Sequence, residues 1–231
     1  MPVNERQISM KSTIDDLLGE LQPYGAQLVA VSKTKPASLI REAYDAGQLD
    51  FGENYVQELV TKQNELPAEL RWHFIGHLQS NKVKLICPFV HLIHGADNLK
   101  LIQTISKYAI AAHRTIDILL QVHIATEETK FGFSATELLP FVSALAEKPL
   151  EGIRIRGLMG MASFTSDQNL VSNEFRGLKK LFDETGSNIK GAGNFKWDTL
   201  SMGMSADYKI ALKEGSTLVR IGSAIFGTRQ N

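Results

Sequence analysis

Short apolar runs alternate with longer segments of helical periodicity along almost the whole chain, and this alternation restricts the possible folds most. The apolar runs predict strands at 28–31, 50–52, 72–75, 90–94, 116–124, 153–161, 199–202 and 218–221. Helical patterns lie between them, near 37–46, 54–65, 80–86, 98–112, 135–147, 168–184 and 206–213. A strand followed by a helix in units of about thirty residues is typical of a (β/α)8 TIM barrel, an α/β fold of ~250 residues. A doubly wound open sheet also alternates, but it usually has fewer strands.

The segments outside this alternation predict one domain over residues 1–231. No linker rich in Pro, Gly or Ser divides the chain. Residues 8–21 form an amphipathic pattern before the first strand, and we expect this extra N-terminal helix to cap or flank the barrel. Two helix starts are marked: Ser134 stands at capping-box spacing from Glu137, and Ser205 immediately precedes the pattern at 206–213.

Composition excludes several classes of function. The 25 basic and 25 acidic residues balance, so the chain lacks the basic footprint of a nucleic-acid-binding protein. The one cysteine, Cys87, excludes an internal disulfide framework, and its apolar surroundings indicate a buried structural thiol. The charged N-terminus is followed by no long apolar core, which argues against a secretory signal or a membrane span. We therefore expect a cytoplasmic protein without a nucleic-acid or membrane partner.

A lysine at the end of the first strand is the first candidate for chemistry. Val31-Ser32-Lys33-Thr34-Lys35-Pro36 closes the apolar run at 28–31 and leads into a helical pattern. Function in a barrel gathers at the carboxyl ends of the strands. Burial there, with the neighbouring cation Lys35, favours the neutral amine of Lys33, which attacks carbonyls. A plain cationic strand end is the alternative.

Two glycine turns near the C-terminus predict a phosphate site. Ser201-Met202-Gly203-Met204-Ser205 is a strand exit leading into a helix, whose first amides attract anions. Ile221-Gly222-Ser223-Ala224 is a second such turn after the eighth strand. Barrel phosphate sites are often built from the loops after strands seven and eight. A lysine and a phosphate site together suggest pyridoxal phosphate, which carries an aldehyde and a phosphate; Arg220 is then placed to sit beside its ring nitrogen.

Several ordered motifs carry a resemblance to a known family. They are residues 30–36, Phe51-Gly52-Glu53-Asn54-Tyr55, Trp72-His73-Phe74-Ile75-Gly76, residues 78–82, Arg156-Gly157-Leu158-Met159, residues 200–205 and residues 219–227. On these the chain resembles the pyridoxal phosphate homeostasis proteins, single-domain relatives of the alanine racemase barrel, over nearly all of residues 28–229. Some relatives carry a proline at the position of His77, so we assign this histidine no essential chemistry.

The resemblance implies the roles of individual residues. Lys33 would hold pyridoxal 5'-phosphate as a Schiff base, the internal aldimine. Ser201, the amides of Met204 and Ser205, and the Gly222-Ser223 turn would hold the phosphate. Arg220 would face the pyridine nitrogen. We add Asn54, at the end of the second strand, to the cofactor-binding residues, and expect no metal.

The arginine argues for a carrier and against an enzyme. A guanidinium only donates hydrogen bonds, so it keeps the ring nitrogen unprotonated and makes the ring a poor electron sink. The racemase also draws a catalytic tyrosine from an appended domain for which this chain leaves no room. We therefore expect a monomer without a catalytic site that buffers, protects or delivers the cofactor to apo-enzymes.

Three alternatives stay open. A small racemase on the same barrel is one, with His77 or Lys130 as conceivable substitutes for the missing base. A regulatory interaction protein that senses the cofactor is another. Lys35 and Lys130 are also possible secondary aldehyde acceptors, although Glu127 and Glu128 favour the charged form of Lys130.

Overall fold

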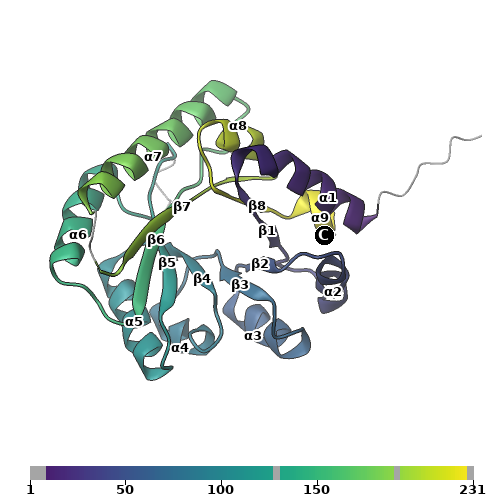
Figure 1. The fold of residues 1–231 in the computed structure, drawn as a ribbon, viewed down its shortest axis with the longest axis horizontal. Coiled ribbons are helices and arrows are strands. Elements are labelled where there is room, and N and C mark those ends of the chain that lie inside the picture. The colour runs from purple at the N-terminus through teal and green to yellow at the C-terminus, as the bar shows by residue number, and fades with distance from the viewer. Residues whose placement is uncertain (1–8, 127–130, 190–192, 228–231) are drawn as a thin grey trace, which may run out of the picture.

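Eight parallel strands close into a barrel in chain order. The structure is a computed structural model that describes residues 9–126, 131–189 and 193–227. Each strand pairs with the next, and β1 pairs with β8, which confirms the predicted (β/α)8 fold (Figure 1). The strands are β1 Gln27–Val31, β2 Asp50–Glu53, β3 Arg71–Phe74, β4 Leu92–Ala96, β5 Ile116–Gln121, β6 Ile153–Met159, β7 Phe195–Met204 and β8 Leu218–Ile221.

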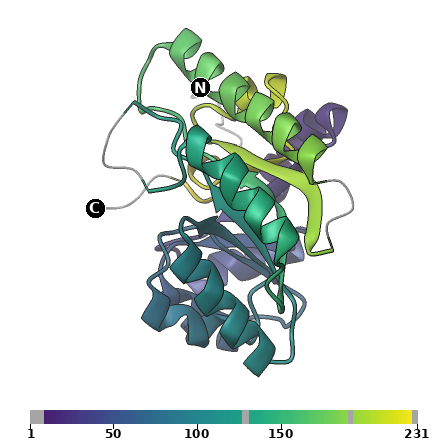
Figure 2. The same cartoon turned by 90° about the vertical axis from the view of Figure 1, so that its left-hand side faces the viewer.

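Helices surround the strand ring. They are α1 Met10–Leu21, α2 Ala37–Asp45, α3 Val56–Glu65, α4 Val83–Ile86, α5 Leu99–Ala111, α6 Ala135–Glu147, α7 Gln168–Asn188, α8 Tyr208–Lys213 and α9 Ser223–Phe226, with 3-10 turns η1 Gln22–Tyr24 and η2 Ser80–Lys82. Figure 2 shows the long α7 lying along the outside of β7. None of the helices in the described parts of the chain is long and apolar enough to span a membrane.

The expected N-terminal helix flanks the barrel. The last helix, α9, has only four residues and cannot cover the outside of β8 and β1. Helix α1 packs against α9, β1 and α2 through a face that buries Ile14, Leu17 and Leu21 (Figure 1). The first helix of the chain therefore takes the place that a full eighth helix would fill.

The core has two layers because successive side chains of a strand point to opposite faces. Outward-facing residues such as Phe51, Phe74 and Ile93 join the helices in the main core. Inward-facing residues form a smaller apolar cluster inside the barrel, made of Val29, Leu92, Leu119, Met159 and Leu218. The rest of the barrel interior includes buried polar side chains.

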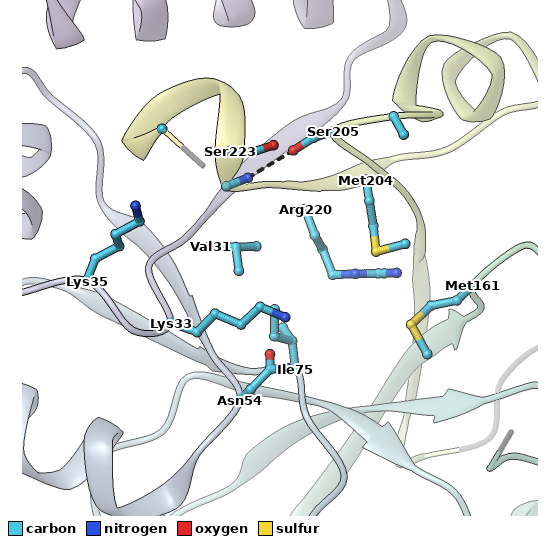
Figure 3. A pocket seen from close by; sticks show the side chains of 13 residues that line it. Val31, Lys33, Lys35, Asn54, Ile75, Met161, Met204, Ser205, Arg220 and Ser223 are labelled. Atoms are coloured by element: carbon cyan, nitrogen blue, oxygen red, sulfur yellow. Dashed lines mark hydrogen bonds between the residues drawn. The ribbon is translucent and has the colours of Figure 1, made fainter. Parts of the chain in front are cut away.

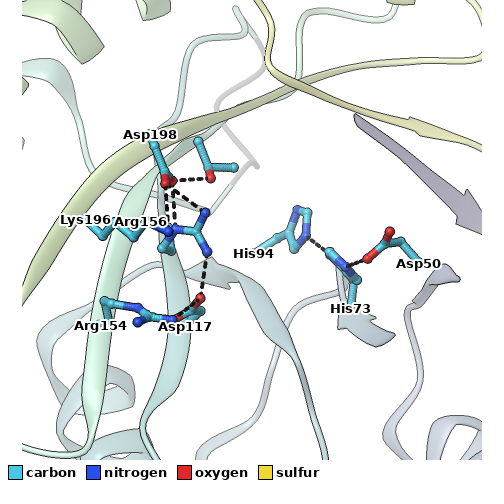
Figure 4. Close-up of polar contacts among 9 residues, drawn as sticks. Asp50, His73, His94, Asp117, Arg154, Arg156, Lys196 and Asp198 are labelled. Carbon is cyan, nitrogen blue, oxygen red and sulfur yellow. Dashed lines mark hydrogen bonds and ion pairs between the residues drawn. The ribbon is translucent and has the colours of Figure 1, made fainter. Parts of the chain in front are cut away.

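Ion pairs close the amino-terminal end of the barrel across β5, β6 and β7. Asp117 accepts two hydrogen bonds from Arg154, at 2.7 and 2.9 Å, and one from Arg156 at 2.8 Å. Arg156 also binds both carboxylate oxygens of Asp198 (Figure 4). Each cation here faces a carboxylate.

The strands and helices lie where the sequence patterns predict them, with limits that differ by a few residues in several elements. The Ser134–Glu137 capping box is present as predicted. Strand β7 begins at Phe195, four residues before the predicted start, because Phe195-Lys196-Trp197-Asp198 alternates apolar and charged side chains. Ser205 does not cap α8: Asp207 takes the cap position, and the Ser205 hydroxyl accepts from the backbone N–H of Gly222 instead.

Candidate functional site

A cavity of about 330 Å³ opens at the carboxyl ends of the strands (Figure 3). This volume suits a small molecule. Among the described residues that line it are three cations and no acid. The lining consists of Val31, Lys33, Lys35, Asn54, Ile75, Met161, Met204, Ser205, Ala206, Arg220, Gly222, Ser223 and Gly227. The structure thus brings seven of the eight predicted site residues to one cavity, and Ser201 lies beneath it.

Lys33 stands on a tight turn that directs its side chain into the cavity. The backbone N–H of Lys35 donates to the carbonyl of Ser32 at 3.0 Å, which closes the turn. In Figure 3 the Lys33 side chain extends toward Asn54 and Arg220. Thr34 has a φ of 63°, a left-handed conformation that costs a β-branched residue energy and is kept only where the surroundings enforce it.

A buried group of charges holds this turn from both sides. The ammonium of Lys62 on α3 donates to the carbonyl of Ser32 at 2.8 Å, to Glu53 at 2.7 Å and to Glu58 at 2.5 Å. Glu58 in turn accepts from the backbone N–H of Thr34 at 2.6 Å. Lys62 therefore holds the main chain on both sides of Lys33, directly at Ser32 and through Glu58 at Thr34. These bonds explain how the strained turn persists.

Glu53 is the least satisfied member of this group. Its Oε1 accepts from the hydroxyl of Ser32 at 2.6 Å, while its buried Oε2 has no hydrogen-bond partner among the described residues. Burial raises the pKa of Glu53, and the nearby charge of Lys62 opposes this shift. Through Oε1 this carboxyl group joins Ser32 to Lys62.

The second lysine of the hexapeptide lies differently. The ammonium of Lys35 donates to the backbone carbonyl of Phe226 at 2.8 Å, so it ties the first turn to α9. In Figure 3 its side chain points away from Lys33. Lys130, the other possible aldehyde acceptor, lies outside the described residues.

Loops after β7 and β8 form the opposite wall. Gly203 has a φ of 94°, and a Cβ there would lie 2.6 Å from the Cβ of Ala211. A Cβ on Gly222 would lie 2.8 Å from the carbonyl oxygen of Val31. Both turns therefore require glycine, and they bring the hydroxyls of Ser205 and Ser223 to the cavity.

Two predicted phosphate donors are engaged elsewhere. The backbone N–H of Met204 donates to the carboxylate of Asp207 at 2.6 Å, and only the Met204 side chain faces the cavity. Ser201 is fully buried, and its hydroxyl bonds Arg220 and His94. Helix α8 has six residues and α9 four, so neither supplies a sizeable helix dipole. An anion in this cavity would meet hydroxyls, loop amides and cations.

Arg220 forms the floor of the cavity without a carboxylate in its hydrogen bonds. Its Nη1 donates to the hydroxyl and the carbonyl of Ser201, at 2.5 and 3.0 Å, and its Nη2 to the carbonyl of Gly160 at 3.2 Å. The residue is only 4% exposed. Burial lowers the pKa of Arg220 to about 10, so it remains a cation at neutral pH. No carboxylate of the described residues forms an ion pair with it, although the charge of Asp207 acts on it from a longer distance.

Asn54 offers a vacant acceptor at the same place. Its Oδ1 is buried and has no hydrogen-bond partner among the described residues, although Figure 3 shows it directed toward Lys33. A buried polar atom without a partner is costly. A ligand with a hydrogen-bond donor would satisfy it.

Two other predicted residues stay outside the cavity. His77 pairs with Asp97 at 3.2 Å and stacks on Phe131 with ring centroids 4.0 Å apart. Cys87 is buried, as predicted, and burial raises the pKa of its thiol to about 12.

Sequence reasoning missed Lys62, His73 and His94. Lys62 sits on a helix pattern where lysine is usually exposed, and nothing in the pattern marks it as buried. The two histidines stand in the middle of strands with apolar neighbours, Trp72-His73-Phe74 and Ile93-His94. A polar residue at an inward-facing position of a predicted barrel strand is the sequence signal that could have identified both histidines.

Comparisons with a family model, with curated proteins and with solved structures all point to the same family. Residues 9–230 match the family described as alanine racemase, N-terminal domain. The chain is 44% identical to a pyridoxal phosphate homeostasis protein of Pseudomonas aeruginosa, over 90% of this chain and 86% of that protein. Two structures of PipY from Synechococcus elongatus superpose on 95% of this chain and 100% of theirs. The one without PLP has a TM-score of 0.88 at 35% identity, and the one with PLP bound a TM-score of 0.84 at 34%.

Proposed function

Because the chain belongs to the pyridoxal phosphate homeostasis proteins, within the alanine racemase N-terminal domain family, we propose that it binds pyridoxal 5'-phosphate in the cavity at the barrel mouth. Its role is to buffer, protect or deliver this cofactor in the cytoplasm, to the benefit of apo-enzymes that need it. The buried single thiol is compatible with that compartment.

The charge of the cavity carries the proposal. Lys33, Lys35 and Arg220 line it with no acid among the described lining residues, so it favours an anionic guest. The hydroxyls of Ser205 and Ser223 and the Gly222-Ser223 turn supply hydrogen bonds for a phosphate, and Asn54 supplies an acceptor for a donor on the ligand. A small ring with a phosphate, a hydroxyl and an aldehyde matches all of these groups.

Lys33 is the residue that we assign to the covalent bond. Its neutral amine attacks the aldehyde carbon, a C=N bond replaces the C=O bond, and the oxygen leaves as water. The clamp of Lys62 and Glu58 holds the backbone on both sides of this lysine, so its amine meets the ligand from a fixed position. Lys35 is tied to Phe226 and is a poorer candidate.

Arg220 determines what the bound cofactor can do. Bound pyridoxal phosphate supplies electron-withdrawing chemistry that is strongest when its ring nitrogen is protonated. Arg220 donates hydrogen bonds and cannot accept a proton, so a ring nitrogen facing it stays unprotonated. We infer a holding role in preference to catalysis.

The test is an absorption titration with pyridoxal 5'-phosphate, followed by borohydride reduction and peptide mapping. We expect the wild type and the Lys35→Ala variant to form the adduct, and Lys33→Ala to lose it. Lys213→Ala, on the exposed end of α8, is the matched control. Full adduct formation by Lys33→Ala, or mapping of the reduced adduct to another lysine, contradicts the assignment.

Activity assays separate the carrier from the racemase alternative. Incubation of the loaded protein with L- and D-alanine should leave their optical purity unchanged. If the wild type turns over an amino acid and Lys33→Ala does not, the proposed carrier function is wrong. The proposal that the cavity binds the cofactor would still stand.

A further inference from the structure

A continuous row of hydrogen-bonded groups crosses the barrel interior from its amino-terminal end to the cavity. Asp50 Oδ1 lies 3.0 Å from His73 Nε2, and His73 Nδ1 lies 2.9 Å from His94 Nε2 (Figure 4). His94 Nδ1 lies 3.1 Å from the hydroxyl of Ser201, which accepts from Arg220. We call these five residues, Asp50, His73, His94, Ser201 and Arg220, the polar chain.

The polar chain is shielded from water over most of its length. His94 and Ser201 are completely buried, His73 is 3% exposed and Arg220 4%. Hydrogen bonds in such a low-dielectric interior are strong, and a missing partner is costly. Elsewhere in the same interior the strands place an apolar cluster that includes Val29 and Leu119. A polar row that replaces apolar packing calls for a functional reason.

If each imidazole ring carries one proton, the two ends of the polar chain fix the direction of every bond in it. A guanidinium can only donate and a carboxylate can only accept. Arg220 therefore donates to Ser201, whose one proton goes to Nδ1 of His94. His94 then donates from Nε2 to His73, which donates from its own Nε2 to Asp50. Both histidines are neutral in this arrangement. Burial is the main cause that lowers the pKa of His94 well below its ordinary value, and the neighbouring His73 and Arg220 act in the same direction.

We propose that the polar chain positions Arg220 against the cofactor ring, with His94 as the positioning residue that commits the Ser201 hydroxyl. This inference rests on the proposed function. While His94 takes the Ser201 proton, a lone pair of the hydroxyl faces Nη1 of Arg220. Without His94 the hydroxyl rotates and its proton competes with the N–H groups of Arg220. Among the described residues the guanidinium then keeps its bonds to the carbonyls of Ser201 and Gly160, and it loses the hydroxyl contact that completes its fixed orientation.

The first measurement needs no cofactor. Long-range 15N–1H spectra of the full-length protein at neutral pH should show His73 and His94 as neutral Nε2–H tautomers. A doubly protonated His73, or an Nδ1–H tautomer of His94, overturns the inferred direction whether or not the proposed function holds.

The second measurement is binding of pyridoxal 5'-phosphate to variants. His94→Phe should weaken binding about fivefold and shift the absorption band of the bound cofactor, since a hydrogen bond in a charged network is lost. His94→Asn, whose Oδ1 replaces Nδ1 as acceptor for Ser201, should restore most of the affinity. His91→Gln is the control, because the exposed His91 ring lies tilted beside His73, with centroids 5.4 Å apart, and makes none of the hydrogen bonds of the polar chain.

A double-mutant cycle distinguishes positioning from simple stability. If His94 acts through Arg220, His94→Phe should add no further loss in an Arg220→Gln background. An additive loss, or unchanged binding in His94→Phe, overturns the inference. A wild type that binds no cofactor refutes the proposed function instead, and the spectra still decide the direction of the chain.

Discussion

Arginines at the two ends of the barrel have opposite electrostatic surroundings. At the amino-terminal end, Arg71 and Arg154 form hydrogen bonds to Asp50 and Asp117 that raise their pKa values. At the carboxyl end, Arg220 donates to neutral oxygens of the described residues, and burial lowers its pKa to about 10 although the charge of Asp207 opposes this shift. A compensated cation stabilises the fold. A buried cation without a direct ion pair favours a ligand that brings negative charge into the cavity.

The largest effect on stability should come from removing a carboxylate at the amino-terminal end of the barrel. Asp117→Ala leaves Arg154 and Arg156 without their shared buried carboxylate, and we expect a loss of about 3 kcal/mol of unfolding free energy. Cofactor affinity should stay unchanged in the folded protein. Urea unfolding and an absorption titration measure the two quantities. Asp198→Ala, which removes a half-exposed partner of Arg156, is the milder control.

Acid should lower the unfolding free energy in a defined pH range, through protonation of Asp50 at the amino-terminal end of the barrel. Burial alone would raise the pKa of Asp50, but hydrogen bonds from His73 and Arg71 outweigh it and lower the pKa to about 2, from 3.8. The native state therefore binds fewer protons than the unfolded state between these values. The resulting stability, about 2 kcal/mol, is complete above pH 4 and is lost as the pH falls toward 2.

Unfolding of Asp50→Asn across this range checks that sign. At neutral pH the variant should be less stable than the wild type, and the difference should shrink as the pH falls from 5 to 3. A difference that stays constant with pH would show that Asp50 contributes packing and no charge.

The smallest effect is expected at the carboxyl end of the barrel, where Arg220 should matter for binding more than for stability. Arg220→Gln should weaken binding of pyridoxal 5'-phosphate about tenfold, or ~1.4 kcal/mol, and change the unfolding free energy by less than about 1 kcal/mol. Isothermal titration and urea unfolding provide both values. A large loss of stability with unchanged affinity would place Arg220 with the structural arginines.

The fold was predictable from sequence because each unit carries its own pattern. Strand β8 at Leu218–Ile221 and helix α6 at Ala135–Glu147 have the predicted limits, since an apolar run and a capping box mark them locally. The early start of β7 was missed because its first residues include Lys196 and Asp198.

Only those site residues that belong to a recognisable sequence motif were predictable. Lys33 and the two glycine turns follow strand ends, and the barrel brings strand ends together. The engagement of the Met204 amide by Asp207 depends on how one loop closes, which no periodicity reports. The contact of His94 with Ser201 joins residues 107 positions apart and exists only once the barrel is closed.

The pairing of β1 with β8 also sets when the site comes into being during synthesis. Lys33 emerges from the ribosome among the first residues of the barrel, whereas Arg220, Gly222 and Ser223 emerge among the last. A nascent chain therefore exposes the lysine long before the opposite wall exists. Selective capture of the ligand must wait until translation of the barrel is finished, so partial translation products of this chain should not compete for it.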